Sequence, residues 1–134
     1  MARTSPTIAL ILFAHGARAQ IWAQPLHRLK EEMARIRPDA RVEIAFLEIQ
    51  DPDLMQALLM MVKDGLFEID IAPVFWSAGG HILQDLPSLI GKFRENYPDV
   101  RVRVLPVLSE LPGMSHFVAS TLLASISTAP QSPV

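Results

Sequence analysis

Residues 73–87, PVFWSAGGHILQDLP, read as the end of a buried strand, a short loop and the start of a helix. The bulky apolar run Pro73–Trp76 is typical of a strand end. Asp85–Pro87 supplies a capping carboxylate and a proline that fits a first helical turn. Gly79-Gly80 lets the loop between strand and helix adopt backbone conformations that other residues avoid. His81 follows the two glycines and is expected to be exposed. The stretch therefore predicts a strand–helix unit with an exposed histidine at its junction.

The same alternation continues along the whole chain. Four apolar or alternating runs predict strands, and four runs with apolar residues three and four apart predict helices. The predicted strands are Thr7–Ala14, Arg41–Leu47, Glu68–Phe75 and Val100–Val107, and the predicted helices begin between Ile21 and Gln24, after Asp51, after Asp85 and at Leu111. Asp51 and Asp85 are the predicted N-caps of the second and third helices. Short links between alternating elements predict an α/β fold, with a parallel sheet and helices on both faces.

Composition narrows the class of protein. The 134 residues predict a single domain over residues 1–127 and a frayed tail over 128–134. The net charge of −2 and the scattered basic residues argue against nucleic acid or a membrane as partners. The chain has no cysteine, which excludes disulfides, thiolate metal ligands and thiol catalysis. The apolar run Ile8–Ala14 is too short to cross a bilayer and has no cleavage site after it, so we expect a cytoplasmic protein.

Polar side chains follow the predicted strands at the point where each strand ends. His15 follows the first strand, Glu48 the second and His81 the third. Ligands of open α/β sheets bind outside these carboxyl ends. Two imidazoles and a carboxylate suit a borderline divalent metal and proton transfer near neutral pH. Gly16 favours a positive φ beside His15, which would let a flat ligand approach the backbone.

Three stretches resemble a known family in order and spacing. LFAHGAR, VEIAFLEIQDP and PVFWSAGGHILQDLP, between about Ile8 and Val107, resemble the small sirohydrochlorin cobalto- and ferrochelatases, the single-domain class II chelatases. The resemblance implies a flavodoxin-like chelatase domain with strand order 2-1-3-4, assembled as a homodimer. It implies a lyase that inserts Co²⁺, Fe²⁺ or Ni²⁺ into sirohydrochlorin for cobalamin or siroheme synthesis. The metal ion is then a substrate, and no organic cofactor is expected.

The resemblance also implies roles for individual residues. His15 and His81 match the two metal-site histidines of the family, and Glu48 matches the acid of its FLE motif. We expect the two imidazoles to hold the metal and to accept pyrrole protons, with Glu48 as a proton relay. Arg18 is expected either to bind a substrate carboxylate or to pair with Glu48.

The remaining predicted contacts concern the macrocycle. Gly79 and Gly80 are expected to let it approach the backbone, and Trp76 to contact it. Trp76 replaces the smaller aliphatic residue usual in the family, which alters the wall of the pocket. Ala17 replaces the family's serine, so the hydroxyl of that serine is missing here.

Two alternatives use the same residues. A non-catalytic protein that binds or delivers a metal or a metallo-tetrapyrrole would need the same ligands as a chelatase. Histidine phosphatases carry Arg-His-Gly after their first strand, but Ala14 stands where that arginine would be, so phosphatase activity is disfavoured.

Overall fold

The computed structural model describes residues 8–16, 23–48, 50–77 and 82–128 of the chain. These residues alternate between strands and helices, as the sequence predicts. The strands are β1 (Ala9–Ala14), β2 (Arg41–Phe46), β3 (Glu68–Pro73) and β4 (Arg101–Val104), and the helices are α1 (Gln24–Ile36), α2 (Leu54–Lys63), α3 (Ile82–Asn96) and α4 (Met114–Thr128), with a short 3₁₀ helix η2 (Leu108–Glu110) before α4.

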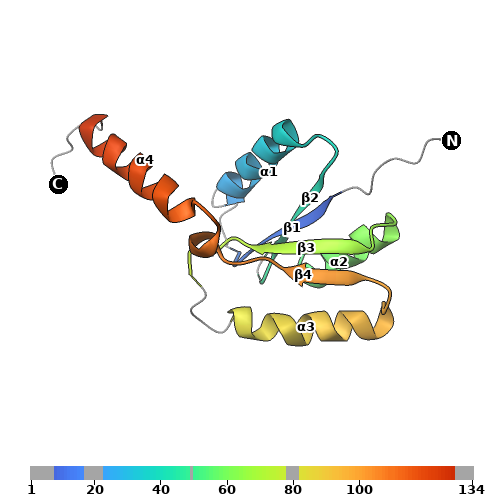
Figure 1. The fold of residues 1–134 in the computed structure, drawn as a ribbon. Coiled ribbons are helices and arrows are strands. Elements are labelled where there is room, and N and C mark those ends of the chain that lie inside the picture. The colour runs from blue at the N-terminus through green and yellow to red at the C-terminus, as the bar shows by residue number, and fades with distance from the viewer. Residues whose placement is uncertain (1–7, 17–22, 49, 78–81, 129–134) are drawn as a thin grey trace.

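The strands form one parallel sheet in the order β2-β1-β3-β4, which confirms the predicted topology. All six residues of β1 are buried, because neighbouring strands flank it and helices cover both faces of the sheet. Figure 1 shows α1 on one face and α2 and α3 on the other. A continuous apolar run is therefore what this central position requires.

Alternate residues of the strands feed two cores on opposite faces of the sheet. The larger core lies against α2 and α3 and includes Phe13, Leu58 and Phe93, each at most 1% exposed. The smaller core lies against α1 and includes Leu12 and Leu26. Both cores meet at β1, so the sheet forms one packed unit with α1, α2 and α3.

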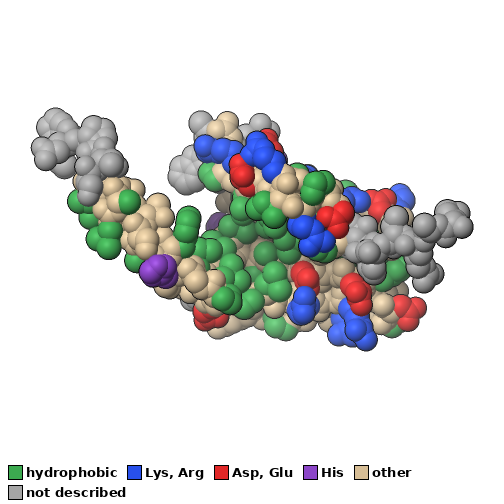
Figure 2. Space-filling view, turned by 45° about the horizontal axis from the view of Figure 1, so that its top comes forward, with side chains coloured by type: hydrophobic (Ala, Val, Ile, Leu, Met, Phe, Trp, Pro, Cys, Tyr) green, Lys and Arg blue, Asp and Glu red, His purple; other side chains and the backbone are tan. Residues whose placement is uncertain are grey.

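The face that carries α1 is covered unevenly. α1 packs over β1 and β2, whereas Ala72, Val74 and Leu105, from the β3–β4 side, are only partly buried at the margin of the smaller core. We call these three residues the open sheet surface. α4 projects away from the sheet instead of lying over them (Figure 1). Figure 2 shows hydrophobic side chains gathered between α1 and α4 on this side.

Two predicted helix caps are wrong. Asp53, rather than Asp51, is the N-cap of α2, because its side chain accepts the Gln56 N–H while the Gln56 side chain accepts the Asp53 N–H, both at 2.8 Å. α3 begins at Ile82, so Asp85 lies in its first turn and Pro87 inside the helix. A carboxylate in the first turn stabilises the positive end of a helix much as an N-cap does. The sequence alone therefore does not distinguish the two positions for Asp85.

The carboxyl-terminal elements also differ from prediction in their bounds. β4 ends at Val104 instead of Val107, and α4 begins at Met114 instead of Leu111. η2 and Gly113, with φ of +79°, occupy the interval between them. The described part of the chain has no helix with the length and apolar character that crossing a membrane requires.

A paired substitution in α2 tests the larger core. Leu58 is fully buried and its neighbour Leu59 is 38% exposed. Leu58→Ala should lower the free energy of unfolding by about 2–5 kcal/mol, because it removes transfer energy and leaves a cavity. Leu59→Ala should cause a much smaller loss, and urea titration followed by circular dichroism measures both. Equal losses would contradict the packing of α2 described above.

Candidate functional site

The carboxyl ends of β1 and β2 are joined beyond the strands themselves. The Leu47 N–H donates to the Ala14 carbonyl at 2.9 Å, and the Glu48 N–H donates to the His15 carbonyl at 3.3 Å. Main-chain hydrogen bonds therefore join the two segments beyond the last ladder pair, Ala14 and Phe46. The main chain fixes His15 and Glu48 next to each other at what we call the carboxyl edge of the sheet.

The side chains of His15 and Glu48 also meet. His15 Nε2 lies 3.5 Å from Glu48 Oε1, and the two side chains are 52% and 55% exposed. The fold therefore places these two residues, which the sequence singles out, next to each other. Because both are open to solvent, the pair adds little to stability. The pair matters chemically, because an imidazole and a carboxylate next to each other can both interact with a bound ligand.

Gly16 makes this close approach sterically feasible. Its φ is +100°, a conformation that residues with a Cβ rarely adopt. A Cβ at this position would lie 2.1 Å from the Glu48 carbonyl oxygen. That oxygen already accepts the Gln50 N–H at 2.8 Å, so it belongs to the turn that follows β2. The positive φ that the sequence predicts at Gly16 is confirmed, and the reason for it is a backbone contact.

A pocket of about 490 Å³ opens beside His15. Its wall is mostly apolar and comes from α1 and the ends of the strands, whereas His15 and Gln50 supply polar groups. The lining residues are Ala14, His15, Gly16, Ala23, Pro25, Leu26, Leu29, Phe46, Gln50 and Val74. Such a hollow accommodates a ligand with an apolar face that also presents a group to an imidazole.

Trp76 lies beyond the end of β3, and its side chain is 51% exposed. Its carbonyl accepts the Ser109 N–H at 3.0 Å, and the carbonyl of Phe75 accepts the Leu108 N–H at 2.9 Å. η2 therefore holds the main chain of Trp76 in place, while about half of the residue remains exposed to solvent. A contact between this ring and a ligand remains a prediction.

Several predicted site residues lie outside the described residues: Ala17, Arg18, Gly79, Gly80 and His81. Within the described ranges, no three histidine, aspartate or glutamate side chains gather into a metal site. The pairing of His15 with His81 therefore stays a prediction. Gln50 and the α1 side chains of the pocket, Leu26 and Leu29, were not predicted. Gln50 follows β2 as Glu48 does, which is the signal that would have indicated it.

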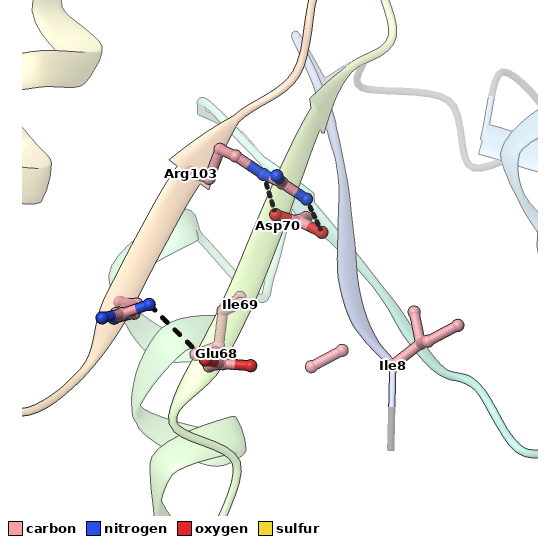
Figure 3. A pocket seen from close by; sticks show the side chains of 7 residues that line it. Ile8, Glu68, Ile69, Asp70 and Arg103 are labelled. Atoms are coloured by element: carbon pink, nitrogen blue, oxygen red, sulfur yellow. Dashed lines mark hydrogen bonds and ion pairs between the residues drawn. The ribbon is translucent and has the colours of Figure 1, made fainter. Parts of the chain in front are cut away.

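A second pocket, of 330 Å³, lies at the amino ends of the strands (Figure 3). Its charges are already paired. Arg103 donates to both carboxylate oxygens of Asp70 at 2.8 and 3.1 Å, and Arg101 lies 3.9 Å from Glu68. The hydrogen bond to Asp70 raises the pKa of Arg103 above its ordinary value. Mutual neutralisation leaves little unpaired charge to attract a ligand, so the pocket at His15 is the stronger candidate site.

Comparison with known protein families gives a match over most of the chain. The family model described as CbiX matches residues 9–124. A protein of Methanocaldococcus jannaschii named sirohydrochlorin cobaltochelatase is 32% identical over 89 residues, 66% of this chain and 62% of that protein. A protein of the same name from Methanopyrus kandleri is 27% identical over 84 residues, 63% and 59% of the two chains. The matched region thus spans about three fifths of these relatives.

Solved structures share the fold. A putative cobalamin (vitamin B12) biosynthesis CbiX protein from Marinobacter aquaeolei superposes with a TM-score of 0.77 at 21% identity, covering 90% of this chain and 98% of the other. The sirohydrochlorin chelatase SirB from Bacillus subtilis subspecies spizizenii, solved with cobalt, gives 0.72 at 23% identity, covering 92% and 51%. At these identities the likeness concerns the arrangement of strands and helices.

Two glycine substitutions separate conformational strain from the backbone contact. Gly16 and Gly65 both have positive φ, but a Cβ on Gly65 meets nothing within 4 Å. Gly65→Ala should lower the free energy of unfolding by about 1–2 kcal/mol, the cost of a left-handed residue. Gly16→Ala should cost clearly more, because the Glu48 carbonyl must also move. Urea titrations of the two variants give the comparison, and equal costs would show that the contact with Glu48 is not needed.

Proposed function

Because the chain belongs to the CbiX family, we propose that it inserts a divalent metal ion into sirohydrochlorin. The observation that supports this most directly is the His15–Glu48 pair at the mouth of an apolar pocket. The names of the curated relatives point to the same reaction, with cobalt as the metal. We therefore propose Co²⁺ as the first metal to test, with Fe²⁺ and Ni²⁺ as alternatives.

Metal insertion into a tetrapyrrole requires two changes that the protein must promote. Water must be removed from the metal ion, and the pyrrole nitrogens must lose their protons as they bind it. A neutral imidazole can ligate the ion or accept a proton, but a protonated imidazole cannot ligate. We assign these tasks to His15 and His81, which alternate between them or divide them. A soft-to-borderline donor such as imidazole suits Co²⁺ and Fe²⁺.

Glu48 is assigned the proton relay. Its carboxylate, 3.5 Å from His15 Nε2, is close enough to orient the ring and to stabilise the imidazolium that proton uptake creates. Both groups are exposed, so a proton taken from the macrocycle passes to solvent without a buried intermediate. This supports a role in turnover rather than in the storage of a metal.

The pocket supplies the surface for the macrocycle. Leu26, Leu29 and Phe46 offer apolar contact to a flat ring system, and the exposed indole of Trp76 offers a second contact at the same edge. Arg18 is assigned to a substrate carboxylate, and Gly79 and Gly80 to close backbone approach. The homodimer, the cobalamin or siroheme pathway and the cytoplasmic location predicted from the sequence stay predictions.

An insertion assay tests the proposal. Sirohydrochlorin and Co²⁺ are mixed with a substoichiometric amount of protein, and the absorbance of the macrocycle is followed beyond the spontaneous rate. Several turnovers per protein molecule support a chelatase. A spectral change that stops at one equivalent contradicts it and indicates a protein that binds or delivers the metallo-tetrapyrrole.

Substitution at the carboxyl edge tests the residue assignments in the same assay. His15→Ala should slow insertion by about 10²–10⁴-fold, the usual contribution of a general acid or base. Glu48→Gln should slow it as well, because the neutral amide cannot take part in proton transfer. His27→Ala is the matched control, since His27 is an exposed histidine of α1 that does not line the pocket. Wild-type rates for His15→Ala would remove His15 from the mechanism.

A further inference from the structure

A further hollow lies next to the pocket at His15. This hollow, which we call the side hollow, has a volume of about 460 Å³ and lies between α1 and the edge strand β2. It shares Ala23, Phe46 and Gln50 with the pocket at His15, so the two hollows adjoin. A ligand held at His15 can therefore extend into the side hollow.

α1 presents different chemistry to the two hollows. Leu26 and Leu29 line the pocket at His15, whereas His27 and Lys30 line the side hollow. Residues three apart on a helix lie on one face, so each pair forms a stripe along α1. The wall of the pocket at His15 is therefore mostly apolar, and the wall of the side hollow is polar.

Lys30 supplies positive charge to the side hollow, and its ion pair is loose. Of the described residues that line this hollow, Lys30 is the one lysine or arginine. Its Nζ lies 3.9 Å from Glu43 Oε2, beyond hydrogen-bond distance, and its side chain is 42% exposed. Glu43 does not depend on this contact, because Arg41 Nε donates to Glu43 Oε1 at 2.9 Å. The ammonium group can therefore turn to another carboxylate without leaving Glu43 unpaired.

We propose that Lys30 binds a peripheral carboxylate of the substrate in the side hollow while the macrocycle lies in the pocket at His15. This inference rests on the proposed function, since it takes a tetrapyrrole with carboxylate side chains as the ligand. Such a ligand has a flat apolar centre and an anionic rim, which matches the neighbouring apolar and polar walls of α1. Lys30 then determines specificity, because it favours a carboxylate-bearing macrocycle over one with apolar side chains.

The size of the substrate supports the use of both hollows. Ligand pockets of about 300–1,000 Å³ hold drug-sized molecules, and the pocket at His15 has a volume of about 490 Å³. A tetrapyrrole with side chains on every ring is larger than a typical drug, so its rim must extend past the apolar wall. The side hollow is an adjoining polar space. Gln50, which borders both hollows, lies where the rim would cross.

Asp51 limits where the carboxylate can bind. It lines the end of the side hollow near Phe46, because the carbonyl of the next residue, Pro52, accepts the Phe46 N–H at 2.9 Å. Glu43, beside Lys30, precedes Phe46 by three residues in β2, which is about 10 Å along the strand. A substrate carboxylate is therefore repelled near Asp51 and attracted near Lys30. The two charges should affect affinity in opposite directions.

Binding of metal-free sirohydrochlorin tests the proposal. The absorbance of the macrocycle is followed as protein is added, and dissociation constants are compared. Lys30→Met should weaken binding about 5- to 10-fold, between the effect of an exposed ion pair and that of a hydrogen bond to a charged group. Lys30→Arg should keep most of the affinity, and Asp51→Asn should bind more tightly than wild type. Lys92→Met is the matched control, since Lys92 is an exposed lysine of α3, on the other face of the sheet.

Insertion kinetics separate substrate binding from catalysis and from folding. With Co²⁺, Lys30→Met should raise KM and leave kcat close to the wild-type value, because the contact is the same before and during the reaction. Its stability in urea should match wild type, since Glu43 keeps its bond to Arg41. His27 is assigned no contact with the substrate, so His27→Ala remains a control for the rate at saturating substrate.

The binding and kinetic results distinguish this inference from metal insertion itself. Equal dissociation constants for Lys30→Met and wild type, or equal losses in Lys30→Met and Lys92→Met, would overturn the contact at Lys30 and leave metal insertion untouched. A wild type that binds sirohydrochlorin without turnover would contradict metal insertion, while the titration alone would still decide the contact. A wild type that does not bind the macrocycle would overturn both.

Discussion

The parallel pairing of β1 with both β2 and β3 is the constraint on which the rest of the molecule depends. It brings the carboxyl ends of three strands to one edge and therefore brings residues that are distant in sequence to one place. A main-chain hydrogen bond beyond the strands joins Glu48 to His15, so the main chain and not a side-chain contact sets their separation. A site built in this way keeps its geometry while its functional groups remain exposed.

Exposure explains why the site adds little to stability yet is chemically useful. A buried imidazole–carboxylate pair would resist both metal and proton exchange, because desolvation penalises changes of charge. At the carboxyl edge the His15–Glu48 pair is exposed to solvent. The apolar wall of the pocket beside it supplies the surface on which a ligand can be buried. The opposite end of the sheet shows the contrast, since there each guanidinium already has a carboxylate partner.

The sequence predicted the parts of the fold that local pattern controls. The continuous apolar run of β1 and the helical spacing of α1 identified those elements because each pattern has a single explanation. The cap at Asp51 failed because Asp53 offers the same chemistry two residues later and has Gln56 to complete the box. The pocket wall of Leu26 and Leu29 was not predicted, since a helical stripe does not say which side chains border a cavity. The direction in which α4 leaves the sheet could not be predicted either, because a helical pattern does not say where a helix packs.

Val74 belongs to two surfaces at once, because it lines the pocket beside His15 and forms part of the open sheet surface. Whatever covers that surface therefore touches the wall against which a ligand rests. The two surfaces can be coupled through this side chain, and thermodynamic reciprocity makes any such effect on affinity equal in both directions. Replacement of Val74 by a smaller side chain would therefore alter both surfaces, and a change in ligand binding by such a variant would not by itself identify which of the two is responsible.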